Sequence, residues 1–297
     1  MKAYDKAPRA EAANDKADLL SLAEKRQAVS LVSDEIYHGH GRKGMELIET
    51  GALGATDSAH DVFFARSESR RDLPMPEAVA IKRFRRHESA AKELANLREV
   101  QNRGLRTVEP VYEGIYQIGD MGDVLITAHI PRFTTMNQVG WHDHQAGQEG
   151  YQELASMLRA IGAFTGRMQG AGVIHNDWQL KNVGQVADGE FVVFDVEGAR
   201  FFDPNSEDEL ETVEFSGNCL EDMSKLIGSL INNRFLATAS PELFEQEIAD
   251  NLIAPYLENG GHIGVLENYD ELMANAATLR RQSPGMNPAD LGRLILA

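Results

Sequence analysis

The sequence contains very little cysteine and no long apolar run. Cys219 is the single cysteine among 297 residues, which excludes an internal disulfide framework and favours a reducing compartment, so we expect a cytoplasmic protein. No uninterrupted apolar segment reaches the roughly 18 to 20 residues that a membrane-spanning helix needs. The N-terminus is polar and carries charges of both signs, unlike a secretory signal. We therefore expect no membrane insertion.

Positive charge is also scarce. The chain has 29 Lys and Arg residues against 46 Asp and Glu residues, a formal net charge of −17. This balance argues against nucleic acid as the main partner, because binding a phosphate backbone requires a basic face. The basic run 82–86 is a local exception, which we interpret as the solvated end of a strand. The sequence does not specify an oligomeric state.

The predicted secondary structure changes from strands to helices near residue 128. Before that point, short segments rich in Val, Ile and Phe predict strands, with one amphipathic helix between the third and the fourth. We predict the strands over 45–49, 62–66, 78–84, 111–117 and 123–127, and the helix over 88–103. Beyond residue 131, helical spacing predicts helices over 152–169 and 220–231. This order predicts an α+β protein whose small antiparallel sheet carries one main helix and precedes a mainly helical part.

One segment combines a hairpin signal with polar residues. Asp188-Gly189 is a two-residue turn signal between the apolar segments 183–186 and 191–194. If the chain folds about that turn, residues whose numbers sum to 377 face each other, and Asn182 faces Asp195. An amide oxygen and a carboxylate oxygen brought together suit Mg²⁺, or Mn²⁺ in its place, because such a cation takes few protein ligands and binds phosphates and water as well.

Asp177 lies five residues before Asn182, in a loop after an apolar strand-like pair. A carboxylate at this place could orient an attacking hydroxyl beside the cation. The pattern His175-x-Asp177-x4-Asn182, followed by Asp195-x-x-Gly198, resembles the catalytic loop and the metal-binding loop of the protein-kinase-like superfamily. The resemblance covers about 45–231 and implies a bilobal fold, with an N-terminal extension over 1–44, a nucleotide-binding lobe over 45–128 and a catalytic lobe over 129–297.

The resemblance also implies roles upstream. Lys82, in the segment Val-Ala-Ile-Lys, is similar to the lysine that holds the α- and β-phosphates of ATP. Glu93 resembles the helix glutamate that pairs with this lysine, although Glu88 or Glu99 could take the role instead.

Two further segments are matched by their position. The loop 50–56, with Gly51 and Gly54, stands where the family covers the phosphates. The link 128–131 corresponds to the hinge, where the backbone of Ala128 and Ile130 would receive adenine.

Several departures from typical protein kinases point to an atypical branch. Asn176 replaces the arginine before the catalytic aspartate, and Gln179 replaces a lysine, with Lys181 as another source of positive charge. Asp222 lies only 27 residues after Asp195, too few for a long activation segment. It resembles the helix aspartate that braces the catalytic loop, although it could equally be an ordinary carboxylate near a helix N-terminus. These features are similar to RIO-like and lipopolysaccharide-kinase-like proteins, and to aminoglycoside and choline phosphotransferases.

The implied activity is ATP- and Mg²⁺-dependent transfer of the γ-phosphoryl group to a hydroxyl. Asp177 and Lys82 would act in catalysis, and most of the acceleration would come from positioning and charge stabilisation. Two alternatives stay open: a pseudokinase that binds nucleotide without turnover, and a nucleotidyl transferase on the same fold. The acceptor is a hydroxyl-bearing protein or a small molecule, and the sequence does not distinguish between them.

Overall fold

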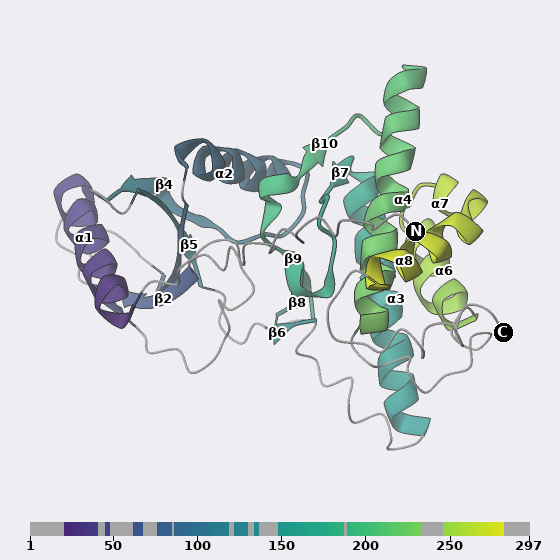
Figure 1. Cartoon of the computed structure of the whole chain (residues 1–297), viewed down its shortest axis with the longest axis horizontal. Helices are drawn as coiled ribbons and strands as arrows, with labels where there is room; N and C mark the ends of the chain where they lie inside the picture. The colour runs from purple at the N-terminus through teal and green to yellow at the C-terminus, as the bar shows by residue number, and fades with distance from the viewer. Residues whose placement is uncertain are drawn as a thin grey trace, which may run out of the picture. The chain divides into compact units, whose positions relative to one another are not determined.

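A computed structural model describes residues 21–40, 45–47, 62–67, 76–84, 86–118, 122–129, 134–136, 148–186, 189–232 and 246–281 of the chain (Figure 1). The chain forms two compact units. Unit 1 comprises Met1–Ala91 and Pro110–His129, and unit 2 comprises Lys92–Glu109 and Ile130–Ala297.

Unit 1 is built on a five-stranded antiparallel sheet with the order β1-β2-β3-β5-β4. Its strands are β1 (Met45–Leu47), β2 (Val62–Ser67), β3 (Ala78–Arg83), β4 (Pro110–Gln117) and β5 (Asp123–Ala128). The helix α2 (His87–Asn102) lies between β3 and β4 in the sequence. The predicted order βββαββ and the predicted α+β class are therefore confirmed.

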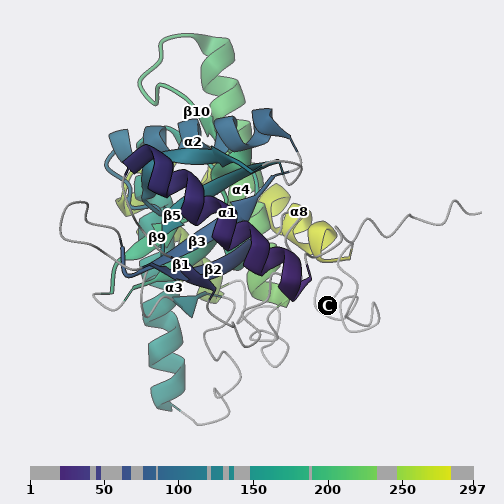
Figure 2. The ribbon, with the colours of Figure 1, turned by 90° about the vertical axis from the view of Figure 1, so that its left-hand side faces the viewer.

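One face of this sheet is covered by helix α1 (Leu22–His40), which crosses the strands in Figure 2. Ala28, Val29 and Val32 of α1 join the apolar side chains of the sheet in one buried cluster. Alternation along β2 explains the contact, since Phe63 and Ala65 are buried while their neighbours are more exposed. Burial of apolar surface, worth about 25 cal/mol per Å², holds α1 on the sheet.

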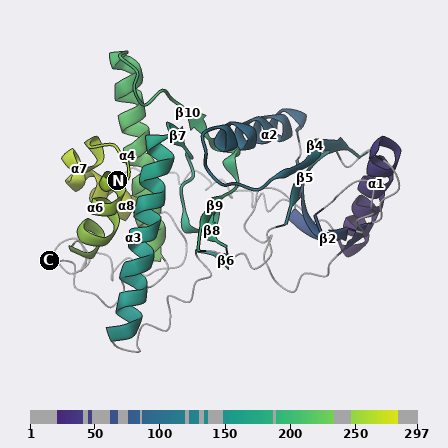
Figure 3. The same cartoon turned by 180° about the vertical axis from the view of Figure 1, so that it is seen from behind.

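Unit 2 is mainly helical. Its longest helices are α3 (Gln148–Gly170) and α4 (Glu209–Asn232). The π-helical segment η6 (Ala249–Ile253) and the helix α6 (Ala254–Glu258) pack against α3, and α7 (Gly264–Glu267) and α8 (Tyr269–Arg281) pack against α4. Figure 3 shows α6, α7 and α8 beside the two long helices from behind. Among the described helices, none has the length and apolar character that crossing a membrane requires.

Two glycines let α3 approach its neighbours closely. A Cβ atom on Gly162 would lie 2.3 Å from the carbonyl oxygen of Leu252, and one on Gly166 would lie 2.2 Å from that of Tyr256. Real atoms do not come so close, so only glycine permits this backbone contact. The spacing of four residues places both glycines on one face of α3.

Helix α4 begins eleven residues before the predicted start at residue 220. Asp208 caps it, because its Oδ1 atom accepts bonds from the backbone N–H groups of Leu210 and Glu211 at 2.8 and 3.2 Å. Leu210 and Val213 are exposed, so burial of these two apolar side chains does not hold the first turns of α4.

Short strands of unit 2 carry the segment with the predicted chemistry. They are β6 (Thr134–Thr135), β7 (Val173–Ile174), β8 (Val183–Gln185), β9 (Phe191–Val193) and β10 (Arg200–Phe201). β8 and β9 form the predicted hairpin, with β6 on the other side of β8, whereas β7 pairs with β10.

The predicted register of this hairpin is wrong by one residue. Val183 faces Val193 and Gln185 faces Phe191, so the numbers of paired residues sum to 376. The N–H of Val186 donates to the carbonyl of Glu190 at 3.0 Å, and Gly189 has φ +86°. The connection therefore has three residues and ends in a left-handed glycine, a common alternative to the two-residue turn. Asn182 consequently pairs with Phe194, whose N–H donates to its carbonyl at 3.2 Å, and not with Asp195.

Candidate active site

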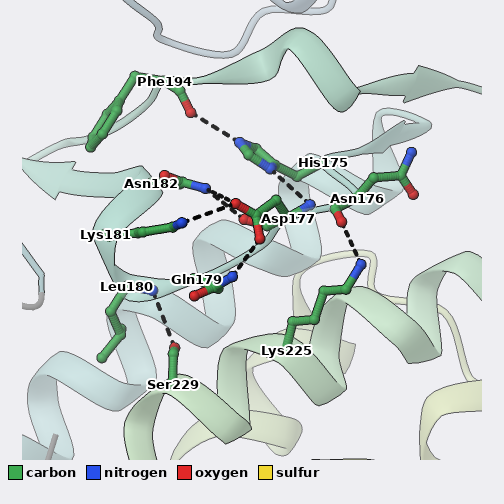
Figure 4. A network of polar contacts seen from close by, with 10 residues as sticks. All are labelled: His175, Asn176, Asp177, Gln179, Leu180, Lys181, Asn182, Phe194, Lys225 and Ser229. Atoms are coloured by element: carbon green, nitrogen blue, oxygen red, sulfur yellow. Dashed lines mark hydrogen bonds and ion pairs between the residues drawn. The ribbon is translucent and has the colours of Figure 1, made fainter. Parts of the chain in front are cut away.

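Residues 175–182 form a loop between β7 and β8, and Figure 4 shows the side chains of Gln179, Lys181 and Asn182 directed toward Asp177. The loop ends in the 3-10 turn η4 (Leu180–Asn182), which leads directly into β8. Its side chains bond mainly to one another and to the segment after β9, so the loop is fixed from within unit 2.

His175 connects the loop to the segment that follows β9. Its Nε2 atom lies 3.0 Å from the carbonyl oxygen of Phe194, and its Nδ1 atom accepts a bond from the N–H of Asp177 at 3.3 Å. A carbonyl can only accept and an amide N–H can only donate, so the imidazole is the Nε2–H tautomer. Trp178 packs against the ring, with 5.4 Å between the ring centroids.

The environment keeps this imidazole neutral. Complete burial lowers the pKa of His175, because the charged ring would lose its hydration. The Phe194 carbonyl and the negative charges of Asp195 and Asp177 raise this pKa, but by less than burial lowers it. Both carboxylates therefore lie within electrostatic range of one buried ring.

Asp177 accepts contacts at both carboxylate oxygens. Its Oδ1 atom accepts a bond from the side chain of Gln179, and its Oδ2 atom accepts one from Nδ2 of Asn182 at 2.9 Å. Nζ of Lys181 lies 3.4 Å from Oδ2. The Asp177 side chain is 43% exposed, so it is held by its own loop and still accessible to a substrate.

Asn182 is almost fully buried, and its amide is oriented by Asp177. Nδ2 donates to the backbone carbonyl of Asp177 at 2.7 Å as well as to the carboxylate. Because both acceptors require a donor, the NH₂ group of the Asn182 amide faces Asp177. The amide oxygen Oδ1 is then the atom that could bind a cation.

Asp195 follows β9 in a left-handed conformation, with φ 59° and ψ 49°. It precedes the 3-10 turn η5 (Val196–Gly198), so the chain leaves the extended conformation at this residue. A left-handed non-glycine residue costs of order 1 to 3 kcal/mol and persists where its surroundings fix it. In this segment, side chains bond to the carbonyls of Phe194, Val196 and Gly198.

Two buried contacts hold the middle of the loop. The indole Nε1 of Trp178 donates to Oγ1 of Thr165 in α3 at 3.0 Å, and the ring is fully buried. The backbone N–H of Leu180 donates to Oγ of Ser229 in α4 at 3.1 Å. The loop therefore rests on both long helices of unit 2.

Asp222 of α4 braces the start of the loop. Its Oδ2 atom accepts a bond from the backbone N–H of His175 at 2.7 Å, so the bracing interpretation is confirmed. The carboxyl group is 1% exposed, and its Oδ1 atom has no hydrogen-bond partner in the described part of the chain. Desolvation raises the pKa of Asp222 to about 7, although the bond from His175 and the charge of Lys225 act in the other direction.

The structure places the other predicted residues as follows. Lys82 lies on β3 opposite Val62 and Leu125, with its Nζ atom 5.1 Å from the centre of the Phe84 ring. Ala128 ends β5. Gly51, Gly54 and Ile130 lie outside the described residues.

The three candidate glutamates of α2 differ in their surroundings. Glu93 is 3% exposed, whereas Glu88 lies on the surface. Glu99 accepts a bond from Nε of Arg103 at 2.8 Å, which lowers its pKa. Of these three carboxylates, Glu93 is the buried one.

Sequence reasoning missed Asn96, Lys225 and Ser229. Nδ2 of Asn96 donates to the carbonyls of Val196 and Glu197 at 2.7 and 3.1 Å, and Nζ of Lys225 donates to the carbonyl of Asn176. These partners lie between 49 and 101 residues away in the sequence. The one available signal was a polar residue at a buried helical position, as with Asn96 on α2.

The described residues contain no group of three or more His, Cys, Asp or Glu side chains that could hold a metal ion by themselves. The donors offered by the predicted pair are the Oδ1 atom of Asn182 and the carboxylate of Asp195. Both are hard oxygen donors, which suit Mg²⁺ when phosphate oxygens complete its shell.

Residues 78–221, just under half of the chain, match the family model of the lipopolysaccharide kinase (Kdo/WaaP) family. This match confirms the resemblance to the lipopolysaccharide-kinase-like branch. It also confirms the predicted enzyme class, a kinase with an alcohol group as acceptor.

A solved structure described as "WaaP in complex with acyl carrier protein" aligns with 80% of this chain and 88% of that chain. The sequence identity is 14% and the TM-score is 0.49. Among curated proteins, no match was found.

Proposed function

We propose that the chain transfers the γ-phosphoryl group of ATP to a hydroxyl of a sugar, with Mg²⁺ or Mn²⁺ as the metal. The observation that supports this most is the linked arrangement of Asp177 and Asn182, in which one amide bonds to the carboxylate and keeps its oxygen for a cation. The match to a lipopolysaccharide kinase family favours a saccharide acceptor over a protein.

Asp177 is the proposed catalytic residue that meets the acceptor hydroxyl. Gln179, Lys181 and Asn182 orient its carboxylate. A fixed carboxylate can accept the hydroxyl hydrogen and direct the oxygen toward the γ-phosphorus. In phosphoryl transfer this positioning contributes more than proton abstraction.

Asn182 and Asp195 are the proposed metal-binding residues. The bound metal would supply positive charge to the triphosphate in a chain whose formal net charge is −17. His175 stays neutral and supports both segments, since it bonds to Phe194 beside Asp195 and accepts from Asp177.

The nucleotide-binding roles are also part of the proposal. Lys82, ordered by Glu93, would hold the α- and β-phosphates, and Gly51 and Gly54 would cover them. The backbone of Ala128 and Ile130 would receive adenine. We further propose that residues 45–128 form the nucleotide-binding lobe and that the protein works in the cytoplasm, as its single cysteine suggests.

The test is transfer of labelled phosphorus to lipopolysaccharide core oligosaccharides. We expect label from [γ-³²P]ATP, and none from [α-³²P]ATP, to enter the saccharide. Asp177→Ala should lower kcat by more than about a hundredfold and change the KM for ATP by less than about threefold, because the carboxylate acts on the acceptor.

Transfer of α-label would show a nucleotidyl transferase. Binding of ATP without any transfer to saccharides or to protein extracts would show a pseudokinase. Transfer of γ-label to protein alone would contradict the saccharide acceptor and leave the kinase chemistry in place.

A further inference from the structure

Amide side chains hold the carbonyls that follow Asp195. From α2, Nδ2 of Asn96 donates to the carbonyls of Val196 and Glu197. From the catalytic loop, Nδ2 of Asn176 donates to the carbonyl of Gly198 at 2.7 Å. Each carbonyl of the turn η5 thus accepts a bond from a neutral donor that lies outside the turn.

Asn176 is itself fixed in an uncommon conformation. Its φ is +66°, a region that Asn tolerates better than most residues. Its carbonyl accepts a bond from Nζ of Lys225, which also pairs with Glu221 at 2.6 Å. The residue before it is held at the backbone by Asp222. Helix α4 therefore holds the main chain, and the amide is left to bond across to Gly198.

We propose that Asn96 and Asn176 are positioning residues that keep Asp195 in its metal-binding conformation. This inference rests on the proposed function, in which Asp195 binds the metal. A left-handed Asp195 is costly unless neighbouring bonds fix it, and these two side chains supply such bonds from two separate elements. Both donors are uncharged amides, and their acceptors are backbone carbonyls.

The test replaces each amide by a carboxylate of the same shape. Asn176→Asp and Asn96→Asp place an acceptor against a carbonyl that needs a donor. We expect backbone amides in 194–199 to exchange with deuterium at least about tenfold faster in both variants. Asn176→Gly tolerates the positive φ and removes only the amide side chain. It should show the same faster exchange, and it serves as the test if the carboxylate of Asn176→Asp disturbs folding.

The matched control is Asn218→Asp. Nδ2 of Asn218 donates to the carbonyl of Glu214 on the surface of α4, at 2.6 Å. Asn218 makes the same kind of bond away from the site. In the Asn218→Asp variant, the backbone amides of 194–199 should therefore exchange with deuterium at the wild-type rate.

A second measurement addresses the metal. Thermal stabilisation by a nonhydrolysable ATP analogue is followed as Mg²⁺ is titrated, and we expect about tenfold more Mg²⁺ for the half-maximal effect in the Asn96 and Asn176 variants. The analogue without metal should bind to all variants alike. Unchanged exchange in 194–199, or an unchanged Mg²⁺ requirement, would overturn the inference.

Asp195→Ala separates this inference from the proposed function. If Asp195→Ala removes the effect of Mg²⁺ while the asparagine variants behave as wild type, the positioning roles are wrong and the metal site stands. If Asp195→Ala itself leaves the Mg²⁺ titration unchanged, the proposed metal site is wrong.

Discussion

At the scale of single residues, two buried groups respond to pH in opposite directions. Asp222 has a pKa raised from 3.8 to about 7 by desolvation, whereas burial lowers the pKa of His175 from 6.5. Asp222 is therefore easier to protonate in the folded protein than in the unfolded chain, and His175 is harder to protonate. Lowering the pH from 7 toward 4 favours folding through Asp222, whereas lowering it below 6.5 disfavours folding through His175.

Asp222→Asn isolates the first of these effects. Asn keeps an oxygen acceptor for the N–H of His175 but does not titrate. The ionised Asp222 destabilises the wild-type protein above pH 7, and this cost disappears as the pH falls toward 4, a difference of about 4 kcal/mol over the whole window. Urea unfolding from pH 4.5 to 7.5 should therefore show that the variant gains stability relative to the wild type as the pH rises. A pH-independent difference would contradict the assignment.

Residue-scale roles were accessible from the sequence when they depended on short spacing. The pattern from His175 to Asn182 lies within one loop, and its side chains do bond to one another. The bonds from Asn96 and Lys225 could not be predicted, because each joins segments that only the tertiary fold brings together.

At the scale of elements, the close contact of α3 with η6 and α6 fixes the position of the helix that supports the loop 175–182. Thr165 of α3 bonds to Trp178, one residue away from Gly166 on the same helix. A side chain at Gly166 would have to displace the backbone of Tyr256, so the effect of a methyl group measures how firmly these helices pack.

Gly166→Ala should lower the free energy of unfolding by about 2 to 3 kcal/mol or more, because its Cβ would lie 2.2 Å from the Tyr256 carbonyl oxygen. Gly217→Ala on α4 is the control, since nothing lies within 4 Å of its Cβ. Relief of the glycine entropy cost should stabilise that variant by about 0.5 to 1 kcal/mol. Equal effects of the two substitutions in urea unfolding would contradict the close packing.

Most elements were predictable because apolar periodicity is strong in α3, β2 and β3, and because β5 contains a continuous apolar run. The exceptions have local causes. The hairpin of β8 and β9 uses a three-residue connection, and a two-residue signal cannot distinguish the two lengths. The first turns of α4 expose Leu210 and Val213, although Asp208 and Glu211 together form a capping pattern that predicts the true start.

At the scale of the whole molecule, a net charge of −17 coexists with a proposed site for a polyanionic nucleotide. Within the catalytic loop, Lys181 lies beside Asp177, so the carboxylate already balances part of the positive charge of Lys181. A metal bound at Asn182 and Asp195 is therefore central to the account, and the match to a lipopolysaccharide kinase family gives the enzyme class but not these residues.

Electron paramagnetic resonance of Mn²⁺, used in place of Mg²⁺ with a nonhydrolysable ATP analogue, tests this claim most directly. We predict one Mn²⁺ bound per chain in the presence of the analogue, with affinity lowered more than about tenfold by Asp195→Ala and by Asn182→Ala, and unchanged by Asn218→Ala. Wild-type affinity in the Asp195→Ala protein would contradict the account.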